Sequence, residues 1–106
     1  MRQQIWKAGF FLLAISLAGP AFSQAPGADT YKAKCAMCHG TDGLANTPTA
    51  KNFKVLSFKD PEMIKATDAQ FIASTTDGKG KMPAYKGKLT DAQIKDVTAF
   101  IRTLQK

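Results

Sequence analysis

Both cysteines and the only histidine of this 106-residue chain lie in one pentapeptide, CAMCH, at residues 35–39. Two cysteines three positions apart project from nearly the same side of a helical turn, and His39 follows the second one directly. Covalent haem attachment needs this arrangement, because each thiol adds to one vinyl group of the porphyrin and the histidine binds the iron as proximal ligand. The motif therefore predicts one haem c held by Cys35, Cys38 and His39.

Three other uses of the motif fit the sequence less well. A closed structural zinc site needs four ligands, and the chain has three Cys and His residues in total, so a carboxylate or a partner chain would have to complete it. Thioredoxin-like chemistry expects the motif beside a βαβ unit, and none is visible. A disulfide between Cys35 and Cys38 would close a tiny loop and constrain the unfolded chain little.

The N-terminal segment has the layout of a secretory signal. Arg2 and Lys7 precede an apolar run over residues 8–18, Gly19-Pro20 then breaks any helix, and residues 21–23 supply small side chains for a signal peptidase. An uncleaved anchor is the alternative, but the run is short of the roughly 20 apolar residues that cross a bilayer. We expect a cleaved signal peptide at 1–23, a domain at 24–106 and a periplasmic location.

The remaining domain is small for a chain that must fold on its own core. Domains of this length bury little surface, so we expect an additional stabilising element, such as a metal, a disulfide or a cofactor. Export places the chain in an oxidising compartment. A covalently held porphyrin would supply the missing apolar surface, and we expect no stable fold without it.

The sequence of the mature chain predicts helices joined by long loops. A first helix is expected from Asp29 to near Gly40, a second after Asp60-Pro61 and a third from Thr67-Asp68 to Gly78. Residues 41–48 are rich in turn formers, and residues 53–59 fit neither a clean strand nor a clean helix.

The last helix is the clearest element of the sequence. Thr90 is its expected cap, and one apolar stripe follows, made of Ile94, Val97, Phe100, Ile101 and Leu104. The residues expected to face water are Lys95, Asp96, Thr98 and Arg102. The pattern as a whole predicts an all-α domain of three to four short helices.

The sixth ligand of the iron cannot be a second histidine of this chain, because His39 is the only one. Met37 lies inside the attachment motif, and Met63 sits in a helical pattern that favours core packing. Met82 stands in GKGKMPAY, where Gly78 and Gly80 allow tight turns and Pro83 stiffens the exit. We therefore predict Met82 as the distal ligand; lysine, the terminal amine, water or an open position are the alternatives.

Over residues 27–105 the chain resembles the small class I c-type cytochromes, the soluble monohaem bacterial and photosynthetic forms. Gly27 and Tyr31 match the small and aromatic positions of the family's first helix, and Phe100 matches the aromatic of its last helix. The resemblance implies the class I cytochrome c fold, long loops wrapped around one haem, with KMPAY carrying the distal methionine. It also implies that the carbonyl of Pro48 accepts a hydrogen bond from the ring N–H of His39.

This reading predicts a one-electron carrier and no enzyme. His39 and Met82 would fill both axial positions, so no site is left for a small-molecule substrate. The pocket lining expected from the apolar residues is Phe53, Leu56, Phe58, Phe71 and Ile72. A haem sensor or peroxidase-like protein is the alternative from another class, and a haem subunit of a larger redox complex is a third.

Charge suggests how such a carrier would meet its partners. The chain has a formal net charge of +7, and four lysines cluster around Met82, namely Lys79, Lys81, Lys86 and Lys88. They are the expected docking face for redox proteins with an acidic surface, because opposite charge speeds encounter. No nucleic-acid partner is expected, since an exported haem protein meets none. The protein is expected to be a monomer.

Overall fold

The computed structural model describes residues 25–106, so the predicted signal peptide at 1–23 lies outside the described residues. The described part is helical and has no strand. Its helices are α1 (Ala28–Lys34), α2 (Ala36–His39), α3 (Pro48–Phe53), α4 (Pro61–Lys65), α5 (Asp68–Asp77) and α6 (Asp91–Leu104). The predicted all-α class is confirmed. These six segments exceed the expected three to four, because the first predicted helix divides at Cys35 and α3 was not expected.

Three predicted helix starts are confirmed by their caps. The Asp60 carboxylate accepts a hydrogen bond from Glu62 N at the start of α4. Thr67 and Thr90 each form a capping box, with Gln70 and Gln93 respectively, at the starts of α5 and α6. Such caps satisfy backbone N–H groups that the first turn leaves free, and each contributes about 1 kcal/mol.

Two helix starts differ from the expectation. α1 begins one residue before Asp29, and its cap is Gly27, in the left-handed region at φ +90°. α3 lies between the expected loop at 41–48 and the expected irregular segment at 53–59, where no helix was predicted, with the Thr47 hydroxyl accepting from Ala50 N and Pro48 in its first turn. A cap residue followed by proline is the same signal that marked α4.

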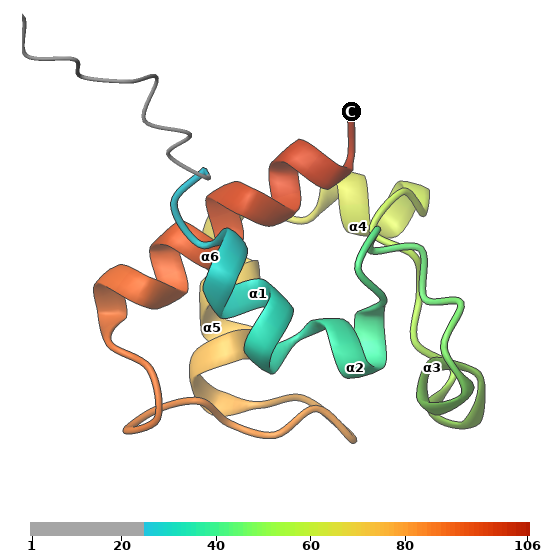
Figure 1. Cartoon of the computed structure of the whole chain (residues 1–106), viewed down its shortest axis with the longest axis horizontal. Coiled ribbons are helices and arrows are strands. Elements are labelled where there is room, and N and C mark those ends of the chain that lie inside the picture. The colour runs from blue at the N-terminus through green and yellow to red at the C-terminus, as the bar shows by residue number, and fades with distance from the viewer. Residues whose placement is uncertain (1–24) are drawn as a thin grey trace, which may run out of the picture.

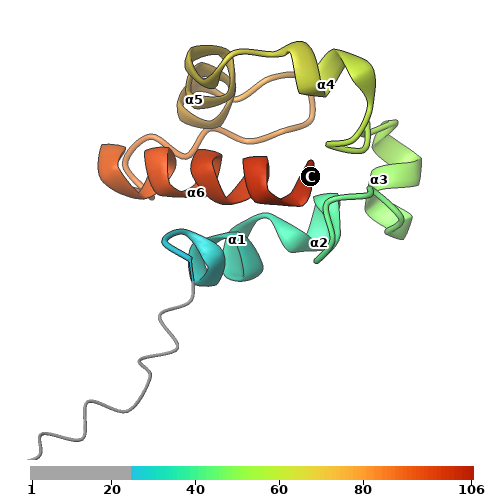
Figure 2. The same ribbon diagram turned by 90° about the horizontal axis from the view of Figure 1, so that it is seen from above.

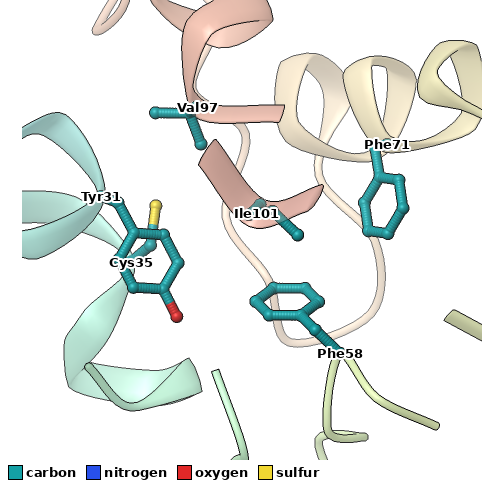
Figure 3. Packing of buried hydrophobic residues seen from close by; sticks show 6 residues of the cluster. All are labelled: Tyr31, Cys35, Phe58, Phe71, Val97 and Ile101. Atoms are coloured by element: carbon teal, nitrogen blue, oxygen red, sulfur yellow. The ribbon is translucent and has the colours of Figure 1, made fainter. Parts of the chain in front are cut away.

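Helix α6 lies between the N-terminal and the central helices (Figures 1 and 2), packing on α1 on one side and on α5 on the other. The side chains that meet there form one core cluster (Figure 3): Tyr31, Cys35, Phe58, Phe71, Val97 and Ile101. The predicted apolar stripe of α6 therefore contributes Val97 and Ile101 to the core, in which α6 packs on α1 and on α5.

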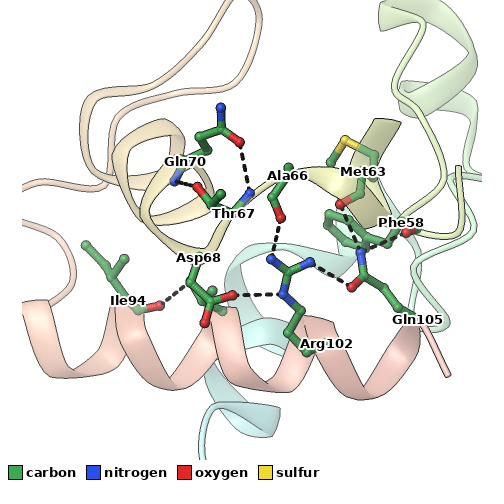
Figure 4. Close-up of polar contacts among 10 residues, drawn as sticks. Phe58, Met63, Ala66, Thr67, Asp68, Gln70, Ile94, Arg102 and Gln105 are labelled. Atoms are coloured by element: carbon green, nitrogen blue, oxygen red, sulfur yellow. Dashed lines mark hydrogen bonds and ion pairs between the residues drawn. The ribbon is translucent and has the colours of Figure 1, made fainter. Parts of the chain in front are cut away.

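Two residues expected to face water on α6 do not. Thr98 is buried, and its hydroxyl donates to the carbonyl of Ile94, which satisfies it within the helix. Arg102 is partly buried, and it pairs with Asp68 at 2.8 Å (Figure 4). Its guanidinium carbon lies 4.6 Å from the centroid of the Phe71 ring. Its guanidinium also donates to Ala66 O, so Arg102 ties the start of α5 to α6.

Among residues 25–106, no helix is long and apolar enough to span a bilayer.

Candidate functional site

A cavity of about 980 Å³ opens between the α1–α2 segment, the α4–α5 region and the loop after α5. This volume is at the upper end of the range for small-molecule and cofactor sites. Cys35, Cys38, His39 and Met82 all line it. The structure therefore brings the four sequence-predicted site residues to the walls of one space.

The attachment motif reaches the cavity from the end of α1 and from α2. Cys35 is the junction between the two helices and belongs to the core cluster, whereas Cys38 is partly buried one turn later. Three hydrogen bonds fix the backbone behind the motif. Thr47 Oγ1 donates to Cys38 O at 2.7 Å, Ala45 N to His39 O at 2.9 Å, and the Tyr31 hydroxyl to Gly40 O at 2.6 Å.

Burial sets the protonation of these groups before haem is attached. It lowers the pKa of His39, so the imidazole is neutral at pH 7 and retains a lone pair for a metal. Burial, with a smaller contribution from Cys38, raises the pKa of the Cys35 thiol to about 11. Once a thioether has formed, the sulfur no longer titrates.

Met82 is presented by a tight turn. Lys79 and Met82 exchange two backbone hydrogen bonds, of 3.1 and 2.9 Å, around Gly80. Gly78 has φ +79°, and a Cβ there would lie 2.8 Å from Met82 O. The glycines noted in the sequence therefore serve two needs: Gly80 supplies a left-handed turn residue at φ +56°, and Gly78 allows close backbone approach.

Tyr85 is a site residue that the sequence analysis did not single out. Its hydroxyl donates to Lys34 O at 2.9 Å, and its backbone N–H donates to Thr75 O at 2.9 Å. The loop that carries Met82 is thus tied both to α5 and to the residue before Cys35. The signal available in the sequence was Tyr85 itself, an aromatic residue with a polar hydroxyl that follows the predicted ligand Met82 closely in the sequence.

The predicted apolar lining is largely confirmed. Phe53, Leu56, Phe58 and Phe71 line the cavity, but Ile72 does not. Ile72 follows Phe71 by one position, and neighbours in a helix point in different directions. The wall also includes residues not predicted, among them Val55, Met63, Ala66, Val97 and Ile101. Met63 both lines the cavity and packs against the core cluster, as its helical pattern suggested.

The hydrogen bond that the resemblance implied between Pro48 and His39 is absent. Nδ1 of His39 is buried and has no hydrogen-bond partner among the described residues. Pro48 is exposed in the first turn of α3, where a carbonyl is committed to the helix's own hydrogen bonds. One face of the imidazole instead packs against the Phe58 ring. The two ring centroids are 4.7 Å apart and the ring planes differ by 18°.

Positive charge surrounds the cavity. Its lining contains Lys34, Lys54, Lys65, Lys79 and Lys81, with Glu62 as the one carboxylate in the set. Lys86 and Lys88 lie in the same loop as Met82 but not in the wall. Phe53 and Leu56 are 46% and 41% exposed, so part of the rim is apolar.

The residues present fit a covalently attached haem. Two thiols, a neutral imidazole and a thioether face a largely apolar cavity of sufficient volume. Haem c is held by two cysteine thioether bonds to the porphyrin, with histidine and methionine as ligands of the iron. Fold and motif together define a small class I c-type cytochrome.

The chain belongs to the family described as cytochrome c oxidase, cbb3-type, subunit III, which matches residues 23–101. It is 36% identical over 96 residues to cytochrome c6 of Nostoc sp., covering 88% of this chain and 83% of the relative. It is 40% identical over 76 residues to cytochrome c6 of Aphanizomenon flos-aquae, covering 71% and 83%.

Solved structures agree with this assignment. The c-type cytochrome KustC0563 superposes with a TM-score of 0.70 at 29% identity, over 76% of this chain and 98% of the other. Cytochrome c6 of the diatom Phaeodactylum tricornutum gives a TM-score of 0.57 at 28% identity, over 76% and 91%. The protein is thus an electron carrier with one covalent haem c, and it exchanges electrons with redox partners.

Proposed function

We propose that this protein is a periplasmic electron carrier in which Cys35 and Cys38 hold the haem as thioethers and His39 and Met82 are the axial iron ligands. One observation carries the proposal: these four side chains, from two segments far apart in sequence, line the same cavity. When bound, the haem supplies a one-electron ferric–ferrous couple. The chain's own residues orient that group and limit water around it.

Met82 is a better candidate for the distal position than Met63, although both line the cavity. Met63 packs against the core cluster, and its backbone carbonyl accepts from Gln105 Nε2 at 3.3 Å. Met82 stands on a loop that the Lys79 turn and the Tyr85 hydrogen bonds hold at the cavity. A sulfur held by the backbone in this way can keep its place in both redox states, which keeps rearrangement small.

We propose no enzymatic role for the protein. His39 is the only histidine of the chain, so no second imidazole is available as a distal acid or base. Among the side chains lining the cavity, Glu62 is the one carboxylate. A peroxidase-like or sensor function would need the distal position open, and Met82 would fill it.

Lys79, Lys81, Lys86 and Lys88 support a docking face for acidic redox partners. All four side chains are exposed, and Lys79 and Lys81 stand at the cavity itself. Lys81 Nζ lies 5.8 Å from the centroid of the exposed Phe53 ring, which joins the charged loop to the apolar rim. A charged rim around an apolar centre favours fast and transient encounter. We propose that the free carrier is a monomer.

The near-infrared absorption of the purified ferric holoprotein tests the ligand assignment. We expect a weak sulfur-to-iron charge-transfer band that is lost in Met82→Ala and retained in the control Met63→Leu. Loss of the band in Met63→Leu with retention in Met82→Ala would reverse the assignment. A high-spin wild-type spectrum without the band would open the sixth position and favour the sensor function.

A further inference from the structure

Two side chains at the C-terminal end of α6, Arg102 and Gln105, hold the backbone of the segment from Phe58 to Ala66, which contains α4 (Figure 4). Gln105 Nε2 donates to Phe58 O at 2.9 Å and to Met63 O at 3.3 Å. Arg102 Nη2 donates to Ala66 O. The end of one helix therefore fixes this segment, the α4 segment, at its start, at its middle and at its end.

The residues whose carbonyls are held also form part of the cavity wall. Phe58, Met63 and Ala66 all line the cavity. Phe58 belongs to the core cluster, and Met63 and Ala66 pack against that cluster. Each hydrogen bond thus fixes the main chain of a residue that faces the cavity, so a shift of the α4 segment would move the wall.

Arg102 and Gln105 are also bonded to each other. Arg102 Nη1 donates to Gln105 Oε1 at 3.0 Å, which leaves the amide NH₂ of Gln105 for the two carbonyls. On its other side, Arg102 Nε pairs with Asp68 at 2.8 Å, and the guanidinium carbon lies 4.6 Å from the centroid of the cavity-lining Phe71 ring. A planar guanidinium can make these contacts at once, whereas an ammonium group cannot.

The helix that carries these two side chains is better anchored than the segment they hold. α6 packs on both α1 and α5, and it buries Ile94, Val97 and Ile101. α4 is five residues long, which is too short for helical hydrogen bonds alone to keep it in place. The position of the α4 segment therefore depends on side-chain contacts such as those of Arg102 and Gln105.

We propose that Arg102 and Gln105 are positioning residues of the cavity wall, and that they raise the reduction potential by holding the α4 segment closed against water. This inference rests on the proposed function, since it takes the haem to occupy this cavity. Burial is one of the means by which a protein sets the potential of a haem. Water that enters beside the haem stabilises the additional positive charge of the ferric state, and so lowers the potential.

The test measures the reduction potentials of holoproteins whose substitutions conserve charge. Gln105→Leu removes the donors to Phe58 O and Met63 O, and Arg102→Lys keeps the charge but loses the planar fork. Both are expected to have a lower potential than the wild type, with the near-infrared band of the methionine ligand retained. The double variant is expected to fall by less than the sum of the two shifts, because the two side chains act together.

Gln93→Leu is the matched control. Gln93 belongs to the capping box at the other end of α6, where its Oε1 accepts from Thr90 N at 2.8 Å, and it does not line the cavity. The substitution removes a side-chain hydrogen bond from the same helix and is expected to lower stability. It is expected to leave the potential unchanged, so a merely structural role of Gln105 would give the same result as this control.

The proposal is overturned if Gln105→Leu and Arg102→Lys keep the wild-type potential, or if Gln93→Leu lowers it equally. A drop accompanied by loss of the near-infrared band would also overturn it, because the ligand rather than the wall would have changed.

Proton NMR of the ferrous wild type needs no variant. We expect nuclear Overhauser contacts from the side-chain amide protons of Gln105 to the α4 segment, and their absence would contradict the proposal. Failure of the proposed function is distinct, because a wild type without the near-infrared band would exclude the axial pair before any variant is compared.

Discussion

The backbone of Gly27 lies directly against the backbone of Asp96, where α1 begins beside the middle of α6. A Cβ at Gly27 would stand 2.5 Å from the carbonyl carbon of Asp96 and 2.7 Å from Val97 N, and the glycine has φ +90°. No side chain fits between these two main chains. The small residue expected at this position therefore has a steric reason, and it sets how closely the helix before Cys35 approaches the C-terminal helix.

We predict that Gly27→Ala lowers the free energy of unfolding by about 3 kcal/mol, from backbone overlap and a left-handed φ together. Gly87→Ala is the matched control, because Gly87 has φ +80° and a Cβ added there would meet nothing within 4 Å, so its cost is expected to be only about 1 kcal/mol. Urea unfolding of the holoproteins, followed by far-ultraviolet circular dichroism, measures both. Equal losses would show that the contact with Asp96 contributes nothing.

Features of the sequence that act locally predicted the structure well. Asp60, Thr67 and Thr90 begin their helices as expected, because each satisfies backbone donors within its own first turn. The attachment motif is also local, since the positions of Cys35 and His39 follow from one short stretch. The same cap logic, applied to Thr47, would have found α3.

Features that depend on contacts between distant segments were not predictable from the sequence. The stacking of Phe58 on His39 joins the attachment motif to a loop that no periodic pattern described. Arg102 was expected in water because a helical pattern places charge outside, but its partners, Asp68 and the Phe71 ring, belong to α5. Such contacts arise only when the helices are assembled.

Loss of the covalent cofactor should abolish the stable fold. The cavity of about 980 Å³ lies beside the core cluster, and Phe58, Phe71, Val97 and Ile101 belong to both. We predict that Cys35→Ala/Cys38→Ala, which cannot form thioethers, loses most helical circular dichroism and cooperative melting. A double variant with native helix content and a sharp thermal transition would show that the chain folds without attached haem.

Gly78 should affect the coordination of the iron by Met82, although Gly78 itself is not a ligand. A Cβ at Gly78 would lie 2.8 Å from Met82 O and 2.9 Å from Ala84 N, so Gly78→Ala must displace the loop. We predict a weaker near-infrared sulfur band and tighter binding of added imidazole to the ferric protein, by about tenfold for each 1.4 kcal/mol of lost Met82 coordination.

Gly80→Ala is the control for this effect. Gly80 shares the left-handed conformation, at φ +56°, but a Cβ there has nothing within 4 Å. Its band and imidazole affinity should stay near those of the wild type. If both variants weakened the band equally, turn strain rather than contact with Met82 would be responsible.

Tyr31 should make stability depend on alkaline pH. Its buried hydroxyl donates to Gly40 O, and burial raises its pKa above the ordinary value of 10.0. The unfolded chain therefore loses this proton at lower pH than the folded one. The contribution of Tyr31 is complete below about pH 10 and falls as pH rises further, by up to 1.36 kcal/mol per pH unit.

Tyr31→Phe tests this dependence. The variant should be less stable at pH 7 by about 1 kcal/mol, because Gly40 O loses its donor, and the difference from wild type should shrink above pH 10. Urea unfolding at pH 7, 9, 10 and 11 measures the difference. A gap that stays constant across this range would mean that Tyr31 ionises alike in the folded and unfolded chain.

The lysines around Met82 should govern the rate of encounter with an acidic partner. We predict that changing Lys79, Lys81, Lys86 and Lys88 together to Glu slows electron exchange with an acidic redox protein at low salt by at least tenfold. It should also reverse the salt dependence, because screening then relieves repulsion.

The matched control changes four other exposed lysines outside the cavity wall, Lys32, Lys51, Lys59 and Lys95, and so alters net charge equally. Stopped-flow rates across a salt series measure both. Equal slowing in the two variants would assign the effect to net charge alone, and no slowing in either would exclude this docking face.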